Sequence, residues 1–115
     1  MKNTMLKIDQ NRRKALRITL FDGDTAYKLA EGEKIILGIK KDLSKTDEYL
    51  ISKVITPANK DGDDYVISLT TAETNVSAGY YKYDIALLRS TGELETLVGA
   101  DDCVIIGSVV RSGEW

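Results

Sequence analysis

Histidine is absent from this chain of 115 residues, and cysteine and proline occur once each. Without histidine, no Ser-His-Asp or Cys-His catalytic arrangement and no histidine metal site can be built. Cys103 has no cysteine with which to form an intramolecular disulfide. It stands in the strand-like run Asp-Asp-Cys-Val-Ile-Ile, which predicts a buried structural thiol rather than a nucleophile.

Long apolar runs are also missing. No segment has the length needed to cross a bilayer, and charges interrupt residues 1–20, where a signal peptide would carry its apolar core. A small domain without disulfides suits a reducing compartment, or assembly in the cytoplasm, better than secretion as a free module. No P-loop, dinucleotide fingerprint or nucleophile elbow is present. We therefore expect no enzyme activity, no cofactor, no metal and no membrane contact.

Charge is distributed unevenly along the chain. The net charge is −2, yet residues 1–17 contain six basic residues and one acidic residue. The cluster Arg12, Arg13 and Lys14 is a candidate contact for an acidic partner, or else a charged edge that keeps the first strand soluble. No stacking aromatics are interleaved with these residues, and the rest of the chain is acidic, so we expect no nucleic-acid binding.

A hairpin at residues 79–98 is the clearest structural signal. Tyr81, Tyr83 and other apolar residues alternate with Lys82 and Asp84, and the turn Ser-Thr-Gly follows. Similar alternation predicts further strands at 4–9, 15–21, 34–41, 48–56, 65–69 and 102–111. Together they predict an all-β fold, an immunoglobulin-like β-sandwich of seven to nine short antiparallel strands.

Domain organisation follows from length and charge, because 115 residues make one domain with a single core. We expect residues 1–15 to form a basic N-terminal arm or first strand, and residues 16–115 to form the single β-sandwich domain. The run 102–111 is apolar on both faces, so it should be a central strand or be covered by a partner chain. Val109 in that run is accordingly a candidate interaction residue.

Tyrosine and aspartate supply further candidates. Tyr81 follows Gly79 by two residues after a crossover turn, as in the tyrosine corner of immunoglobulin-like sandwiches, so its hydroxyl should bond backbone a few residues upstream. Tyr49, Tyr80 and Trp115 are candidates for an exposed aromatic contact surface. Aspartates at strand ends, such as the Asp-Gly-Asp-Asp run from residue 61, fit turn chemistry, and whether they bind calcium stays open.

A family resemblance is carried by several runs. They are Leu-Arg-Ile-Thr-Leu-Phe-Asp-Gly-Asp from residue 16, Leu-Ala-Glu-Gly-Glu-Lys-Ile-Ile-Leu-Gly-Ile-Lys-Lys from residue 29, and the hairpin runs that begin at residues 77 and 92. Over residues 16–110 the chain resembles the N-terminal immunoglobulin-like domain of phage baseplate and tail-fibre proteins. Such proteins normally continue into a coiled coil or receptor-binding head, whereas residues 1–115 contain no heptads.

The resemblance implies a non-catalytic structural module of a phage or prophage tail. Such a module would be located in the virion, would dock on other virion or tail proteins, and could form a homo-oligomer. Arg12, Arg13, Lys14, Val109 and Trp115 are the candidate contacts. The alternative is a carbohydrate-binding or adhesion module of a bacterial surface protein, which would need an exposed aromatic platform.

Overall fold

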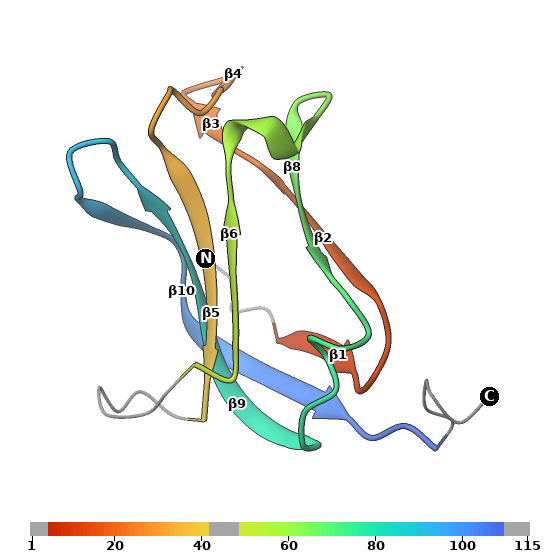
Figure 1. Ribbon diagram of the computed structural model, residues 1–115. Coiled ribbons are helices and arrows are strands. Elements are labelled where there is room, and N and C mark those ends of the chain that lie inside the picture. The colour runs from red at the N-terminus through yellow and green to blue at the C-terminus, as the bar shows by residue number, and fades with distance from the viewer. Residues whose placement is uncertain (1–4, 42–48, 110–115) are drawn as a thin grey trace.

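The computed structural model describes residues 5–41 and 49–109. Within these ranges the chain folds into two main β-sheets that face one another across an apolar interior, with a separate two-stranded hairpin (Figure 1). The expected all-β, immunoglobulin-like sandwich is confirmed. Among the described residues, no helix is long and apolar enough to span a membrane.

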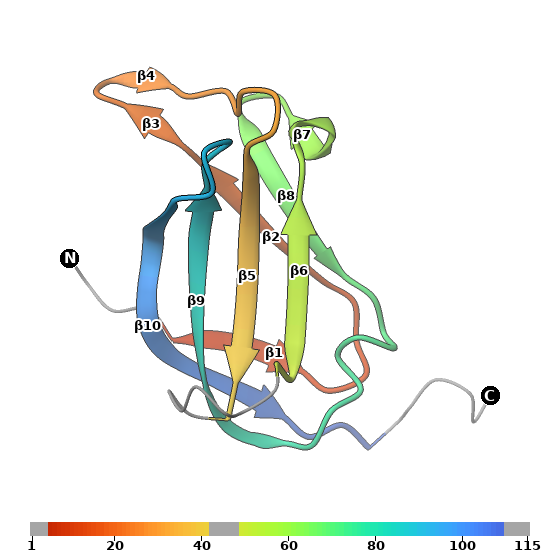
Figure 2. The ribbon, with the colours of Figure 1, turned by 60° about the vertical axis from the view of Figure 1, so that its left-hand side comes forward.

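The larger sheet has five strands in the order β1-β10-β9-β5-β6. Their bounds are β1 (Leu6–Asp9), β10 (Leu94–Ile106), β9 (Gly79–Leu88), β5 (Lys34–Lys40) and β6 (Ile51–Ile55). Figure 2 shows β10, β9, β5 and β6 side by side in this order. Strands distant in sequence are therefore neighbours, as in the variable-type immunoglobulin sandwich.

The smaller sheet has three strands in the order β2-β8-β7. Its strands are β2 (Lys14–Thr19), β8 (Asp64–Leu69) and β7 (Lys60–Asp61). A short hairpin of β3 (Phe21–Asp22) and β4 (Thr25–Ala26) follows β2, and the 3-10 helix η1 (Pro57–Asn59) precedes β7. β2 pairs antiparallel with β8 over six residues without a register shift.

Alternation builds the core, because successive side chains of a strand point to opposite faces. Apolar residues at every second position of β1, β5, β8 and β9 point between the sheets and are buried. The most completely buried are Ile8, Ile35, Leu37, Ile39, Ile55, Tyr65, Ile67, Leu69, Cys103 and Ile105.

The connection into β9 is held by Tyr81. Its hydroxyl donates a hydrogen bond of 2.7 Å to the carbonyl oxygen of Ser77, four residues upstream. Gly79, at φ 153°, stands between them and has only the Tyr81 ring near the position of a Cβ. This is the geometry of a tyrosine corner.

Two expectations were wrong. β1 pairs with β10 in parallel, so the strands are not all antiparallel. The runs near residues 94–98 and 102–111 are one strand, β10, which ends at Ile106 and carries register shifts between Thr96 and Asp101. Val109 lies beyond that strand and is 94% exposed, because the Gly107-Ser108 segment leaves the sheet.

Candidate functional site

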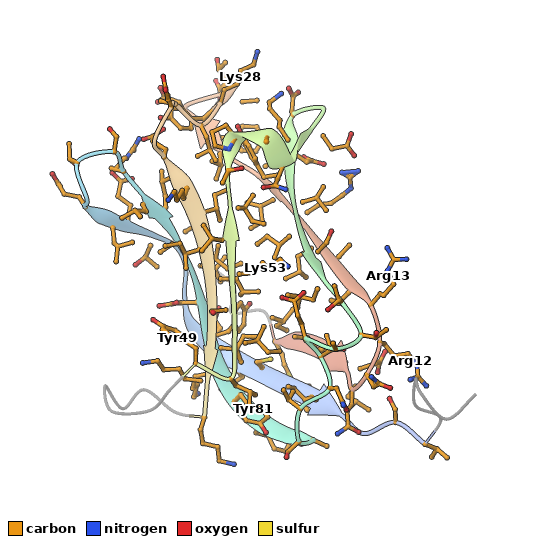
Figure 3. The ribbon with its side chains drawn as sticks, in the orientation of Figure 1. Arg12, Arg13, Lys28, Tyr49, Lys53 and Tyr81 are labelled. Atoms are coloured by element: carbon orange, nitrogen blue, oxygen red, sulfur yellow. The ribbon has the colours of Figure 1, made fainter. Side chains whose placement is uncertain are left out.

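The predicted basic cluster lies at one end of the sandwich. Arg13 is exposed, while Arg12 and Lys14 are half-buried where β1 turns into β2 (Figure 3). The backbone N–H of Arg12 donates to Thr74 Oγ1 at 2.9 Å, which anchors this turn against the β8–β9 connection. The cluster is thus part of the folded domain.

Val109 is brought to the same end of the molecule. Ser108 donates through its hydroxyl to the carbonyl oxygen of Gln10 at 2.5 Å, so the segment after β10 runs beside the β1–β2 turn. Trp115 lies outside the described residues. Of the predicted contacts, the structure therefore groups Val109 with the basic cluster.

The acidic loop at β7 and β8 is engaged in ion pairs. Asp61 and Asp64 both pair with Arg17, which reaches across from β2. Within residues 5–41 and 49–109, no group of three or more acidic or cysteine side chains is placed to hold a metal ion. In the described part of the chain, these aspartates therefore stabilise the smaller sheet.

The two exposed tyrosines do not form a common platform. Tyr80 and Tyr49 are 72% and 59% exposed. The Tyr49 ring packs against Gly38, which pairs with Asp84, whereas Tyr80 lies four residues away along β9, about 13 Å at 3.3 Å per residue. A sugar would therefore meet one tyrosine at a time.

Apolar side chains instead gather on the outer face of the five-stranded sheet. Strand register places Ile36 between Val54 and Ala86, and Leu88 beside Leu94. Val54 is 51% exposed and Leu94 65%, while the other three are half-buried. We call these five residues the outer apolar stripe. Apolar side chains that share one solvent-facing side of a sheet make the outer apolar stripe a candidate interaction surface.

Charges of both signs border the outer apolar stripe. Lys34 pairs in register with Leu88 at one margin, and Asp84 lies two residues before Ala86 on β9 at the other. Farther along, Lys82 forms an ion pair with Asp102. The surface therefore has an apolar centre and a mixed-charge rim, the usual anatomy of a protein interface.

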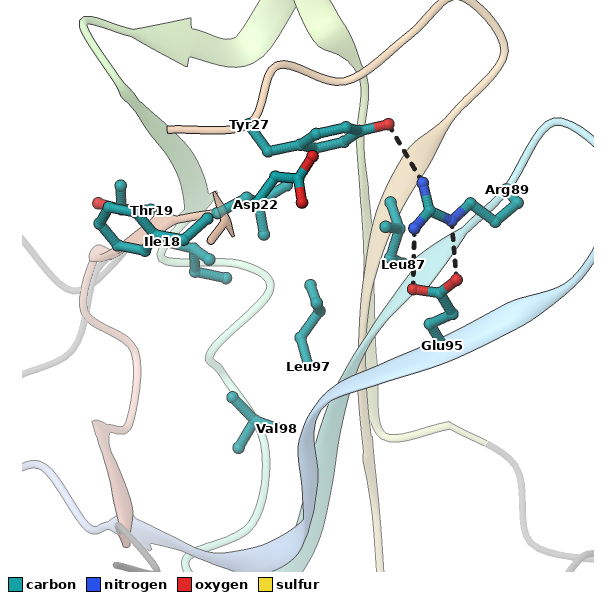
Figure 4. A pocket seen from close by; sticks show the side chains of 11 residues that line it. Ile18, Thr19, Asp22, Tyr27, Leu87, Arg89, Glu95, Leu97 and Val98 are labelled. Atoms are coloured by element: carbon teal, nitrogen blue, oxygen red, sulfur yellow. Dashed lines mark hydrogen bonds and ion pairs between the residues drawn. The ribbon is translucent and has the colours of Figure 1, made fainter. Parts of the chain in front are cut away.

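A groove of about 510 Å³ opens on a different side, between the two sheets. β2 and β3 supply one wall, with Ile18, Thr19 and Asp22 (Figure 4). The first part of β10 supplies the opposite wall, with Leu97 and Val98. The groove is apolar at its floor and polar at its upper end.

Arg89 organises that upper end. Its guanidinium makes two hydrogen bonds to Glu95, at 2.9 and 3.0 Å, and donates to the Tyr27 hydroxyl at 3.1 Å (Figure 4). It also pairs with the buried Glu33 at 2.9 Å. These contacts tie the β4–β5 connection to the β9–β10 hairpin.

Glu33 is held ionised by its donors. The Tyr27 hydroxyl donates to it at 2.6 Å, the Ala30 N–H at 2.8 Å and Arg89 at 2.9 Å, and together they lower the pKa of Glu33 to about 2. Burial raises the pKa of the Cys103 thiol to about 11. Cys103 therefore stays protonated at neutral pH, and both residues have structural roles.

No protein-family model and no curated protein matches the chain. Similar solved structures include the following two. The NK cell receptor NKp44, a triggering partner in natural cytotoxicity, shares 13% identity at a TM-score of 0.45, over 94% of this chain and 100% of that one. The extracellular domain of the voltage-gated sodium channel beta4 subunit shares 12% identity at a TM-score of 0.38, over 92% of each chain.

The beta4 domain forms parallel homodimers with a role in cell-cell adhesion. At these TM-scores, the likenesses carry no argument about the function of the present chain. Its immunoglobulin-like architecture rests on its own strand order and tyrosine corner. Neither structure is a baseplate protein.

Sequence reasoning missed the outer apolar stripe. The signal was present, because Ile36, Val54, Ala86, Leu88 and Leu94 are apolar at positions whose strand neighbours point into the core. The pairing of β5 with β9 could not be predicted from the sequence, since the two strands are separated by about forty residues. Only that pairing brings the five side chains together.

Proposed function

We propose that this chain is a non-catalytic protein-interaction module that self-associates through the outer apolar stripe. The observation that carries the proposal is the register-aligned row Val54, Ile36 and Ala86 across three neighbouring strands, which the rest of the described chain covers only in part: Val54 is 51% exposed and the other two are half-buried. Burial of apolar surface is worth about 25 cal/mol per Å², so a partly uncovered row favours a partner.

The charges that border the outer apolar stripe favour a second copy of the chain as the partner. A two-fold contact requires a surface that is complementary to itself. Lys34 and Asp84 lie on opposite margins of the outer apolar stripe, so a two-fold axis through the stripe would bring a cation of one copy toward an anion of the other. Such rim pairs contribute specificity more than affinity.

Both predicted roles of the module, as a virion component and as an adhesion module, stay part of this proposal. A virion component would use self-association to assemble a tail or baseplate, and an adhesion module would use it to join two surfaces. The separation of Tyr49 from Tyr80, about 13 Å along β9, speaks against the shared aromatic sugar platform that the carbohydrate-binding alternative needs. Gene context separates the two roles, since a tail component would be encoded among virion genes.

Methyl NMR with a soluble paramagnetic agent tests the proposal. Self-association should shield the methyl groups of Val54 and Leu94 from the agent as the protein concentration rises. The methyl groups of Val66, at a half-buried position of β8 in the other sheet, serve as the internal control. Equal relaxation of Val54 at low and high concentration would contradict self-association through the stripe.

A further inference from the structure

Two strand edges face each other across the groove between the sheets. β2 is the edge strand of the smaller sheet, with β8 on its other side. β1 covers β10 only from Cys103 to Ile106, so within the described residues the first part of β10 has a strand neighbour on one side only. An uncovered edge presents backbone N–H and C=O groups that another strand can pair with.

The two sides of the sandwich differ in how well they close. On the β6 side, Ile51 and Ile55 are 4% and 2% exposed. Lys53 Nζ forms an ion pair with Glu73 Oε1 at 3.0 Å on the same side. On the β2 side, Leu16, Ile18, Leu97 and Val98 also face inward, yet all four are only half-buried. The β2 side therefore lacks cover over side chains that belong to the core.

We propose that an extended segment of a partner protein adds to the outer edge of β2 and fills this groove as a fourth strand of the smaller sheet. β2 is the better template, because its register with β8 is regular from Lys14 to Thr19. The edge of β10 is interrupted by register shifts between Thr96 and Asp101, and bulges disfavour strand addition. Strand addition at a sheet edge is a recurring mode of peptide recognition.

The charges around the groove set the direction and chemistry of the added strand. The smaller sheet is antiparallel throughout, so an antiparallel addition continues its pairing. The segment would then enter beside Thr19, where Asp22 lies, and leave beside Lys14 and Arg13.

A segment that complements these charges therefore has a cation near its start and an anion near its end. Apolar residues at alternate positions would contact the half-buried Leu16 and Ile18.

The probe is a capped synthetic peptide of about eight residues that alternates valine and threonine, with lysine near its start and glutamate near its end. A second peptide has the two charges exchanged, and a third has proline at its centre. Each is added to the full chain, and amide hydrogen exchange is followed at residues 14–19 and at 51–55. The second range is the edge strand β6, the matched control.

We expect the first peptide to slow hydrogen exchange of the β2 amides that point away from β8, toward the open edge. Exchange of the β6 amides should stay unchanged. The charge-exchanged peptide should bind about fivefold more weakly, since two exposed ion pairs are replaced by like-charge contacts. The proline peptide should give no protection, because it cannot complete the ladder. In a variant with Arg13→Glu and Lys14→Glu, the preference between the two charged peptides should weaken or reverse.

Several results would overturn the proposal. Absence of protection at β2 with the first peptide at about 1 mM would show that the groove is no strand acceptor. Protection of β6 equal to that of β2 would show non-specific edge pairing. Equal affinity for both charged peptides would reject the assigned direction.

The strand-acceptor groove can fail or succeed independently of the proposed self-association. A Val54→Glu variant disturbs the outer apolar stripe, which lies on the outer face of the larger sheet, so it should still bind the first peptide. Loss of peptide binding in that variant would contradict the assignment of two separate surfaces.

Discussion

The Tyr49 ring lies directly over Gly38, and a Cβ on that glycine would stand 2.6 Å from Tyr49 Cε1. Lys40 Nζ lies 4.6 Å from the centroid of the same ring. The close approach of ring to backbone explains why β5 has a glycine in mid-strand, where glycine weakens the strand. It also fixes the aromatic ring beside the outer apolar stripe.

Gly38→Ala should therefore have an effect that depends on Tyr49. With Tyr49→Ser as the background, alanine should stabilise the strand by about 0.5–1 kcal/mol. With Tyr49 present, displacement of the ring should cancel that gain. A double-mutant cycle from urea unfolding should give a coupling of about 1 kcal/mol. The same change in both backgrounds would show that the ring and the glycine are independent.

Glu33→Gln should destabilise the fold by about 1–2 kcal/mol, because it replaces a buried, charge-assisted acceptor of three hydrogen bonds. The pKa of Glu33 is lowered from its ordinary 4.5 to about 2 in the folded state. A lowered folded-state pKa gives stability that is present above about pH 4.5 and lost as the pH falls toward 2. The difference in unfolding free energy between the native chain and the variant should shrink over that range. A difference that is constant with pH would contradict this account of Glu33.

Tyr81→Phe should remove the hydrogen bond to the Ser77 carbonyl and nothing else. The expected loss is about 1 kcal/mol, or about 5 °C in Tm. Tyr80→Phe is the matched control one residue away, and because Tyr80 is 72% exposed its Tm should stay unchanged. Equal effects of the two substitutions would show that the tyrosine corner adds no stability.

Cys103 should resist thiol reagents in the folded protein. It is fully buried, and its raised pKa of about 11, against an ordinary 9.0, leaves about 100-fold less thiolate. Labelling at pH 8 should therefore become fast only in denaturant, with a midpoint that matches unfolding. Fast labelling without denaturant would show that the β1–β10 pairing opens readily.

Local patterns in the sequence predicted much of the fold. Alternation gave the inward faces of β5 and β8, including Ile35 and Ile67, because strand periodicity is a local property. The parallel pairing of Leu6 with Cys103 was missed, since pairing between the two ends of a chain depends on the whole topology. Val109 was wrongly placed in the last strand, because an apolar run does not reveal where a strand leaves its sheet; its role as a contact residue stays a prediction.

The candidate surfaces depended even more on topology. The basic cluster of Arg12, Arg13 and Lys14 was visible in the sequence as a local run of charge. The outer apolar stripe and the groove were not, since each is formed by strands that meet only after folding. A half-buried core residue such as Ile18 also looks like any other strand residue until its missing neighbour is seen.

Sedimentation velocity from about 1 µM to about 1 mM is the most direct test of the proposed self-association. The chain should pass from monomer to dimer over that range. Val54→Glu, in the outer apolar stripe, should stay monomeric. Val66→Glu, a matched change at a half-buried position of β8 in the other sheet, should associate as the native chain does. A native chain that is monomeric at every concentration, or a Val54→Glu variant that associates normally, would contradict the account.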